Sequence, residues 1–389
     1  MEIKLHEPTF GEEEIQAAVE VLRSTMVTSD SKVREMESHF DNGVMCNSGS
    51  SANLLAIAAL SNPMWPDHLS PGDEVIVSAL SWSTTVWPLV QYGLIPVIVD
   101  IDPETLNIDP KEIEKAIGPR TKAIMPVHVY GNPCDMDALR AITNQYKLDT
   151  VFDCCEALGA TWKKYGEDGD IYCFGDIATI SFYFSHHITT LEGGLVKCRE
   201  NNLTELIRIL RAHGWIRDLQ DDKVYRNANP DIDPKFLFVN AGYNLRATEL
   251  QAAIGLVQLK KLTGFVVTRR RIAKKLTEIF SHYDDLFSIQ HECPKGKSSW
   301  FGFPVIVKNN PAHPHARYIR EHFEKNGIET RPLICGNIAR QPGMKLWPHR
   351  VVGDLRHADH AMKSGFSIGC HQGMTEESCE YVSDVLKML

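Results

Sequence analysis

Residues 181–194 read SFYFSHHITTLEGG, and this stretch decides how the rest of the sequence is interpreted. It begins as an apolar, β-rich run that predicts a buried strand, and it leads through His186 and His187 to a pair of glycines. A histidine pair that follows a buried strand is a candidate catalytic element, because the ordinary pKa of imidazole lies close to neutral pH.

Strand and helix patterns alternate around this stretch, from about residue 44 to residue 200. The candidate strands are EVIVSAL, IPVIVDI, KAIMPVHV, TVFDCC, TISFYF and GGLVKC. Helical patterns such as PKEIEKAIG and MDALRAITNQY lie between them, with apolar residues that recur at three and four positions. The alternation predicts an α/β fold with a mostly parallel central sheet and helices on both faces.

The flanking sequence predicts further helices and a smaller second domain. An amphipathic helix, GEEEIQAAVEVLRS, precedes the sheet, and the helices TELIRILRAHGW and ATELQAAIGLVQLKKL follow it. The tail contains SSWFGFPVIVK, HARYIREHFEKNG, IETRPL and TEESCEYVSDVLKML, which predict a mixture of strands and helices. We therefore expect a large domain at residues 1–264 and a smaller α+β domain at residues 265–389.

Composition and charge narrow the classes of function. The 389 residues are 43% hydrophobic and 23% charged, as in an ordinary globular enzyme. The net charge of -9 argues against nucleic acid or an anionic membrane as the main partner. The start, MEIKLHEPTFGEEEIQ, lacks an export signal, and the apolar window LVQYGLIPVIVDI is too short to span a bilayer. We expect a cytoplasmic protein.

The ten cysteines are scattered along the chain, which predicts reduced residues of the core. Metal binding is the alternative. Only Cys154 and Cys155 are close together, and adjacent cysteines lack the two-residue gap of zinc or iron–sulfur ligand pairs. We expect no metal site.

The segment NSGSSANLLAIAAL places a turn rich in hydroxyl groups directly before an apolar helix. Free backbone N–H groups at the helix start, together with the hydroxyls of Ser48, Ser50 and Ser51, would form a phosphate-binding cradle. The alternative is a serine that merely caps the helix.

Two further side chains follow candidate strands. Asp153 ends an apolar strand, where a carboxylate needs a cation or a protonated heterocycle as its partner, unless it caps the next helix. Trp82 lies just beyond another strand, where its indole could stack on a planar ligand or pack in the core. Strand ends are where open α/β sheets bind ligands.

The order of these features resembles the fold-type I pyridoxal-phosphate enzymes, and among them the sugar aminotransferases. The segments PVHVYGNPCDMDAL and GYNLRATELQAAIGLVQLKKL are also similar to that family, so the resemblance covers nearly the whole chain. It implies an aspartate aminotransferase-like fold with a large cofactor-binding domain and a small C-terminal domain. It also implies a homodimer with shared active sites.

The resemblance implies a role for several residues in holding the cofactor. Gly49 and Ser50 would bind its phosphate, with Ser181 adding a hydroxyl group, and Asn244 would reach the phosphate of the neighbouring subunit. On the ring, Trp82 would lie over the pyridine, Asp153 would pair with the pyridinium nitrogen, and Glu156 would contact the phenolic oxygen.

His186 departs from the aminotransferase pattern, because it stands where the family has the lysine that binds the cofactor covalently. Imidazole cannot form that link. This replacement, together with NSGSSANLLAIAAL, SWSTT, RAHGW and SSWFGF, resembles a narrower group, the nucleotide-sugar 3-dehydratases. Relatives that act on CDP-linked sugars carry a cysteine-rich insertion for an iron–sulfur cluster. Here HGWIRDLQDDKVYRNANPDIDPKF contains no cysteine, so no such cluster is expected.

The resemblance implies a reaction in two halves. L-glutamate would convert pyridoxal 5'-phosphate to pyridoxamine 5'-phosphate, whose amine would then react at the C4 ketone of a nucleotide-linked 4-keto-6-deoxy sugar. His186 would move protons while the C3 hydroxyl leaves, and hydrolysis would release ammonia and a 3-deoxy-4-keto sugar. GDP-4-keto-6-deoxy-D-mannose is the expected substrate, and a CDP-linked sugar stays open. The rival functions are an aminotransferase and a non-catalytic cofactor-binding protein.

Four more residues are candidates for contacts with substrate or glutamate. His187 and His213 could border the site, although a packed position beside the site is favoured for His187. Arg246 and Arg331 could hold a glutamate carboxylate through paired hydrogen bonds, or they could be surface or interface residues.

Overall fold

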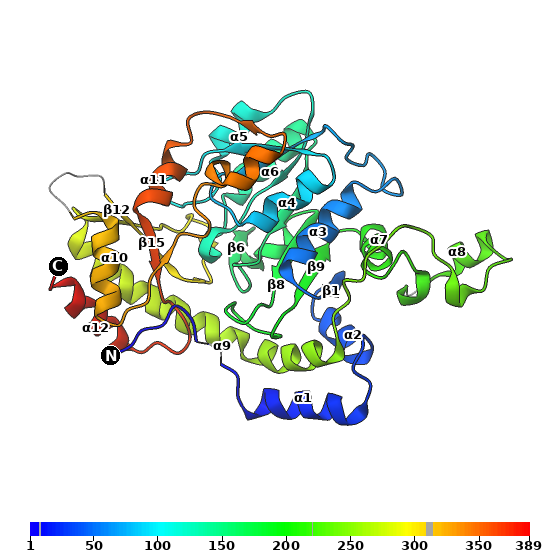
Figure 1. Cartoon of the computed structure of the whole chain (residues 1–389), viewed down its shortest axis with the longest axis horizontal. Coiled ribbons are helices and arrows are strands. Elements are labelled where there is room, and N and C mark those ends of the chain that lie inside the picture. The colour runs from blue at the N-terminus through cyan, green and yellow to red at the C-terminus, as the bar shows by residue number, and fades with distance from the viewer. Residues whose placement is uncertain (8, 220, 309–313) are drawn as a thin grey trace.

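A large mixed β-sheet lies at the centre of the molecule (Figure 1). The computed structural model describes residues 1–7, 9–219, 221–308 and 314–389. The eight strands of the sheet follow the order β1-β9-β8-β5-β4-β2-β3-β14. Only β9 runs antiparallel to its neighbours in this sheet. The strands are β1 (Gly43–Cys46), β9 (Gly194–Cys198), β8 (Ile177–Ser181), β5 (Asp149–Asp153), β4 (Thr121–Met125), β2 (Glu74–Ser78), β3 (Ile95–Val99) and β14 (Arg350–Val351).

Side chains of the central strands alternate between two buried faces. In β2, Val75 and Val77 belong to one hydrophobic core, whereas Ile76 belongs to the other. This alternation follows from the two-residue period of a strand, and it explains why the runs read as almost continuously apolar. The sheet is therefore covered on both sides, and the predicted α/β architecture is confirmed.

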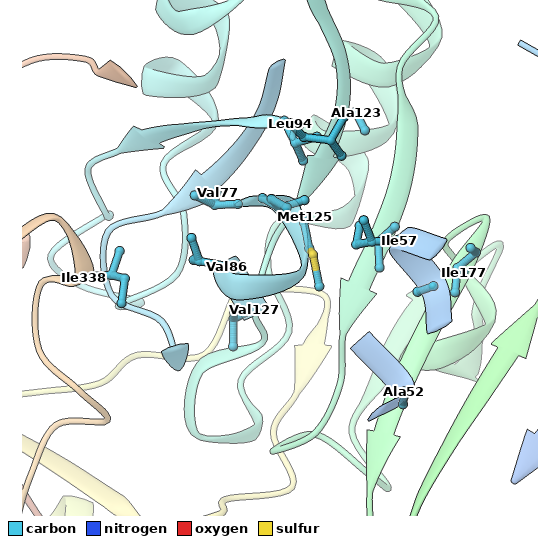
Figure 2. Close-up of a cluster of buried hydrophobic side chains, with 14 of the residues drawn as sticks. Ala52, Ile57, Val77, Val86, Leu94, Ala123, Met125, Val127, Ile177 and Ile338 are labelled. Carbon is cyan, nitrogen blue, oxygen red and sulfur yellow. The ribbon is translucent and has the colours of Figure 1, made fainter. Parts of the chain in front are cut away.

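Helices pack against each face. The first face carries α3 (Gly49–Leu60), α4 (Ser83–Gln91), α7 (Asn201–Arg211) and α11 (Arg356–Ser364), and the second carries α2 (Ser31–Ser38), α5 (Pro110–Ala116) and α6 (Met136–Tyr146). Figure 2 shows part of the first core, where Met125 of the sheet lies near Val86 of α4 and Ile57 of α3. Each such buried aliphatic side chain stabilises the fold by about 1.5–3 kcal/mol.

The carboxyl ends of β5 and β8 lie side by side at one edge of the sheet. Their last residues are Asp153 and Ser181, and the register pairs Asp153 with Thr179. Ser181 is paired in turn with Gly194, the first residue of β9. The connection that carries His186 and His187 therefore begins and ends at this edge.

Helix α9 (Glu249–Phe280) runs along the bottom of the molecule, with α1 (Glu12–Ser24) beside it (Figure 1). The buried carboxylate of Glu14 joins the two helices, because it accepts hydrogen bonds from Gln258 Nε2 at 2.8 Å and Lys261 Nζ at 2.7 Å. By length and composition alone, α9 is the one helix of the described chain that could cross a membrane. In the folded protein, however, α1, α2 and α12 (Glu376–Leu386) pack against this helix.

The C-terminal part forms a second core around an antiparallel sheet in the order β10-β12-β15-β13. Its elements are β10 (Phe287–Ile289), β12 (Phe303–Val307), α10 (Ala316–Lys325), β13 (Arg331–Pro332), β15 (Gly365–Ile368) and α12 (Glu376–Leu386). A three-stranded sheet is made of β11 (Gly296–Lys297), β6 (Thr161–Lys164) and β7 (Glu167–Asp170).

The division into residues 1–264 and 265–389 stays a prediction. Helix α9 continues across that boundary without a break. Ile3 belongs to the C-terminal core and forms a bridge with Ile328, while β14 joins the large sheet from the C-terminal side. The two parts of the chain thus exchange short segments.

The sequence located the long helices and the central strands, but one strand end was wrong. The run TISFYF was expected to be a strand through Phe184, yet β8 ends at Ser181. Beyond Ser181 the ladder with β9 stops. The Phe182 N–H still donates to the carbonyl of Gly193 at 2.9 Å, and the Phe182 carbonyl accepts the N–H of Thr190 at 2.9 Å. The histidines therefore lie in an irregular connection. The predictions also lacked β1, the hairpin β6–β7, α2, α4, α11 and α8 (Lys223–Ala228).

Candidate active site

A cavity of about 560 Å³ opens at the carboxyl edge of the large sheet. It brings together most of the side chains that the sequence pointed to. The predicted residues that line it are Gly49, Ser50, Trp82, Asp153, Glu156, Ser181, His186 and Arg331. Residues more than 280 positions apart therefore meet in one place, as strand-end sites of α/β sheets do.

The start of α3 has the properties of a phosphate cradle. Ser48 caps the helix, and its side chain accepts the N–H of Ser51 at 3.1 Å. A Cβ atom at Gly49 would lie 2.5 Å from Cβ of Ser181, so only glycine allows the helix to approach β8 this closely. Ser50 Oγ donates to Thr84 Oγ1 at 3.2 Å, which adds a hydroxyl from α4. Helix N–H groups and hydroxyls suit a phosphate.

Asp153 presents a well-anchored carboxylate to the cavity and is 3% exposed. Its Oδ2 accepts hydrogen bonds from Asn53 Nδ2 at 2.9 Å and Thr85 Oγ1 at 2.8 Å. Its Oδ1 accepts the backbone N–H of Cys155 at 3.1 Å. All three partners are donors, which is the environment that a carboxylate needs when it faces a protonated heterocycle.

Trp82 caps α4 and is 46% exposed, so core packing does not explain it. Its indole lines the cavity and offers a flat face on which a planar ring could stack. The guanidinium carbon of Arg331 lies 5.8 Å from the centre of that indole, within the range of a cation–π contact. Arg331 therefore reaches the cavity from the C-terminal part of the chain.

Glu156 lies at the side of the same cavity, and its Oε2 accepts the backbone N–H of Tyr130 at 2.8 Å. Burial raises the pKa of Glu156 to about 7. Tyr130 itself has a positive φ of 55°, an unusual conformation for a bulky residue. Backbone strain of this kind is concentrated at functional sites, and Ile334, which also lines the cavity, has a φ of 44°.

His186 is held by a single strong hydrogen bond. Its Nδ1 lies 2.6 Å from the carbonyl oxygen of Cys155. A carbonyl can only accept, so Nδ1 carries the proton and Nε2 is left as the basic nitrogen. Burial lowers the pKa of His186 to about 4, below the ordinary value from which the sequence reasoning started. The imidazole is consequently neutral at physiological pH, with the Phe301 ring centre 5.0 Å away.

His187 lies beside this site and does not line the cavity among the residues described. It is buried, and its Nε2 lies 3.1 Å from the carbonyl oxygen of Ser299. Burial and the nearby charge of Arg269 hold the pKa of His187 well below its ordinary value. This position agrees with a packing role and offers no contact with a ligand in the cavity.

His213, Asn244 and Arg246 lie away from the cavity, in a cluster of their own. Arg246 Nε donates to Asn244 Oδ1 at 3.2 Å, and Arg246 Nη2 lies 3.4 Å from His213 Nε2. Arg246 lines a separate cleft of about 810 Å³ between α2 and α7. None of these three side chains therefore lines the cavity within the same chain.

The sequence missed two groups of residues around the cavity. Asn53 and Thr85 were not recognised as partners of Asp153, although an asparagine inside the apolar run ANLLAIAAL is a signal of a buried polar contact. The aromatic side chains of Tyr183, Phe184 and Phe301 also line the cavity. They gave no signal, because an exposed aromatic cannot be distinguished from a core residue in a single sequence.

Among the described residues, no group of three or more His, Cys, Asp or Glu side chains could hold a metal ion. The side chains of the cavity instead fit pyridoxal 5'-phosphate. The α3 turn suits its phosphate, Asp153 suits its ring nitrogen, and Trp82 suits its ring face.

The family model described as the DegT/DnrJ/EryC1/StrS aminotransferase family matches residues 8–387. The chain belongs to this family. Membership confirms the family resemblance drawn from the sequence, and it covers both the large sheet and the C-terminal part.

Within the family, the chain is similar to GDP-4-keto-6-deoxy-D-mannose 3-dehydratases. It is 39% identical to the enzyme of Yersinia pseudotuberculosis, over 97% of this chain and 96% of that protein. The Escherichia coli enzyme with bound hydrated PLP has a TM-score of 0.89 and 34% identity, over 99% of both chains. A structure of a GDP-4-keto-6-deoxymannose 3-dehydratase with a trapped PLP–glutamate geminal diamine has a TM-score of 0.90 and 34% identity, over 99% of this chain and 100% of that one. The predicted fold type is thereby confirmed.

Proposed function

We propose that the protein is a pyridoxal-phosphate-dependent nucleotide-sugar 3-dehydratase, a lyase that removes the C3 hydroxyl group of a 4-keto-6-deoxy sugar. The observation that carries this proposal is the neutral imidazole of His186, which lines the cavity together with Asp153 and the α3 turn, whereas the described lining residues include no lysine. Family members with a lysine there can bind the cofactor covalently. This chain can only bind it through non-covalent contacts and use His186 as a base.

Different side chains of the cavity would bind different parts of the cofactor. Pyridoxal phosphate supplies an electron-withdrawing ring and, in its pyridoxamine form, an amine for the C4 ketone of the sugar. The α3 turn with Ser181 would bind the phosphate group, while Asp153 would keep the ring nitrogen protonated and Trp82 would orient the ring. Glu156 would contact the phenolic oxygen. Together these contacts replace the covalent tether.

His186 moves the protons of both half-reactions at its Nε2 atom. The Nδ1–H stays bound to the carbonyl of Cys155, so the ring cannot rotate away while Nε2 accepts a proton and returns it. The aromatic surroundings of His186 exclude water from one side of this nitrogen. A protonated Nε2 is also able to donate to the departing C3 hydroxyl.

L-glutamate is the proposed amino donor, and Arg331 the proposed binder of one of its carboxylates. Arg331 is exposed on the cavity side of β13, and none of the described salt bridges involves it. A guanidinium in this state can form paired hydrogen bonds with an incoming carboxylate. The similarity to an enzyme trapped with PLP and glutamate supports glutamate as the amino donor.

The proposed sugar substrate is GDP-4-keto-6-deoxy-D-mannose, on the strength of the similar dehydratases. The net products are the 3-deoxy-4-keto sugar nucleotide, 2-oxoglutarate from the oxidised glutamate, and ammonia. A CDP-linked 4-keto-6-deoxyhexose is the alternative substrate, and the two are distinguished by assaying both nucleotides in parallel.

The decisive experiment incubates the purified protein with pyridoxal phosphate, L-glutamate and the GDP-linked 4-keto sugar. We expect ammonia and a product that mass spectrometry identifies as deoxygenated at C3. A stable amino sugar would instead identify an aminotransferase. Failure to form pyridoxamine phosphate from glutamate alone would favour a non-catalytic cofactor-binding protein.

We also propose a homodimer in which each active site is completed by the partner subunit. Asn244, Arg246 and His213 lie outside the chain's own cavity, so their suggested roles require a second copy. The segment around α8 extends from the body of the molecule (Figure 1), and it exposes Val224 at 76% and Phe236 at 67%. Large exposed apolar side chains of this kind are typical of an interface.

Mixed dimers test this arrangement. Homodimers of His186→Asn and of Arg246→Ala should each be inactive. Mixing and re-equilibrating them should restore activity. In a heterodimer each subunit carries one substitution, both substitutions fall in the same shared active site, and the other active site is complete. No recovery, or a monomer in sedimentation, would contradict shared sites.

A cytoplasmic location is the remaining proposal. All ten cysteines are free, which suits a reducing compartment. Fractionation of expressing cells would test it.

A further inference from the structure

Asn53 is a buried polar residue that the proposed reaction does not use directly. It is the only polar residue in the run ANLLAIAAL at positions 52–60, and it is 1% exposed. A buried amide costs free energy unless its hydrogen bonds are satisfied. Its partners therefore identify what the side chain does.

Both ends of the Asn53 amide are hydrogen-bonded. Thr179 Oγ1 donates to Asn53 Oδ1 at 2.6 Å, and Asn53 Nδ2 donates to Asp153 Oδ2 at 2.9 Å. Thr179 must be the donor, since Oδ1 can only accept. With its oxygen taken by Thr179, the amide can present only its NH2 group to Asp153, and a rotated amide would place two acceptors together.

The backbone fixes the position of Thr179 relative to Asp153. The two residues are directly paired in neighbouring parallel strands β5 and β8. Their side chains thus leave the sheet on the same face, toward α3. Asn53 completes a closed arrangement of two strands and one helix, in which none of the three side chains can turn without breaking a buried hydrogen bond.

The same helix holds the proposed phosphate site. Asn53 follows Gly49 by four residues, which is about one turn or 6 Å along α3. One rigid helix therefore positions the phosphate-binding turn and, through Asn53, the carboxylate of Asp153. In a cofactor held without a lysine tether, this spacing would set the distance between the phosphate contact and the ring-nitrogen contact.

We propose that Asn53, oriented by Thr179, is a positioning residue that fixes the Asp153 carboxylate toward the ring nitrogen of the cofactor. This inference rests on the proposed function, because it takes the cofactor ring to lie at Asp153. Non-covalent cofactor binding would then also depend on the amide of Asn53 in α3 and the hydroxyl of Thr179 in β8.

The test uses Asn53→Leu and the near-isosteric Thr179→Val in the full-length protein. The dissociation constant of pyridoxal phosphate is measured by quenching of tryptophan fluorescence, and the absorption spectrum of the bound cofactor is titrated with pH. We expect Asn53→Leu to weaken binding about tenfold, the factor for a lost hydrogen bond to a charged group. The spectral transition of the ring nitrogen should move to lower pH, and Thr179→Val should shift both readouts in the same direction by less.

Two further variants serve as the negative and the positive control for both measurements. Thr150→Val removes a hydroxyl at the other end of β5, where it donates to Asp176 Oδ2 at 2.7 Å, and it should leave both readouts unchanged. Asp153→Asn should change both strongly. If Asn53→Leu fails to fold in a thermal scan, Thr179→Val decides alone.

The outcomes separate the two proposals. If Asp153→Asn changes affinity and spectrum while the Asn53 and Thr179 variants behave like the wild type, the positioning role is overturned and the proposed function stands. If Asp153→Asn itself changes nothing, the placement of the cofactor is wrong and the proposed function falls with it.

Discussion

The Nδ1 atom of His186 lies 2.6 Å from the carbonyl oxygen of Cys155. Cys155 follows Asp153 by two residues, and its backbone N–H donates to that carboxylate. A single turn after β5 therefore holds both the acid that would face the cofactor ring and the carbonyl that orients the base. The backbone thereby sets the tautomer of His186. The carbonyl oxygen of Cys155 can only accept a hydrogen bond, so Nδ1 carries the proton and Nε2 is unprotonated.

Replacing His186 with Lys should convert the cofactor site into a covalent one. The ε-amine would lie where the family lysine lies, so borohydride should trap a bond between protein and cofactor that mass spectrometry detects on the peptide containing residue 186. Deoxygenation should be lost, since the base is gone. The wild type and His186→Gln, treated identically, should show no trapped cofactor. A lysine variant that retains full deoxygenation would contradict the role of the imidazole.

Glu156→Gln should change how stability depends on pH. Burial raises the pKa of Glu156 from 4.5 to about 7, so between these values the unfolded chain releases a proton that the folded protein retains. The wild type should therefore lose stability relative to the variant as pH rises from 4.5 to 7, by at most about 3 kcal/mol. Above pH 7 the difference should stay constant.

Thermal unfolding of the cofactor-free proteins measures this difference. Gln can still accept the N–H of Tyr130, so the packing at residue 156 is preserved. Glu114→Gln on the exposed side of α5 is the control, and it should follow the wild type because its side chain lies in water. Parallel curves for wild type and Glu156→Gln across this range would show that Glu156 is not held protonated.

The sequence predicted those site residues that follow a strand, and it missed those that pair across long distances. Asp153 was recognisable because a carboxylate at the end of an apolar run must have a partner, whereas Ser181 was assigned by resemblance alone. That Asn53 is the partner could not be read, since the two residues are 100 positions apart and only the fold brings α3 onto β5. His186 was recognisable as a candidate base, but the lowering of its pKa by burial could not be read from the sequence, since Phe301 beside it comes from the C-terminal part.

The end of β8 was also predicted incorrectly, because the sequence does not show which residues face a cavity. The apolar letters of Phe182, Tyr183 and Phe184 read as a continuing strand, yet Tyr183 and Phe184 face the cavity instead of pairing with β9. A run of apolar residues indicates only that its side chains avoid water. Aromatic residues that line a binding site therefore have the same sequence pattern as residues of a buried strand. Asn244 was assigned to a neighbouring subunit by resemblance, and Arg246 was a candidate for a glutamate carboxylate; both assignments stay predictions.

Gly49→Ala should weaken cofactor binding and stability together. The added Cβ would lie 2.5 Å from Ser181 Cβ and 3.1 Å from Cys155 Sγ, so the start of α3 must move away from β8. Overpacking of this kind costs about 1–3 kcal/mol, and the displaced turn should bind pyridoxal phosphate at least tenfold less tightly. Calorimetry and fluorescence titration measure the two effects.

Gly264→Ala provides the matched control for this substitution. Gly264 lies within α9, and a Cβ there would meet nothing within 4 Å. The substitution should raise stability by up to about 1 kcal/mol, because alanine favours the helix, and it should leave cofactor affinity unchanged. If the Gly49→Ala protein bound the cofactor as tightly as the wild type, the close packing of the start of α3 against β8 would not be needed for cofactor binding.

Arg331→Gln should separate the two half-reactions. If Arg331 holds the glutamate carboxylate, the variant should raise KM for glutamate about tenfold or more, with a smaller effect on kcat. Protein preloaded with pyridoxamine phosphate bypasses glutamate, so a single turnover with the sugar nucleotide should proceed at nearly the wild-type rate. Arg320→Gln, on α10 outside the cavity, should leave both measurements unchanged. Equal losses in both half-reactions would assign Arg331 to the sugar or to the orientation of Trp82, with which its guanidinium already makes contact.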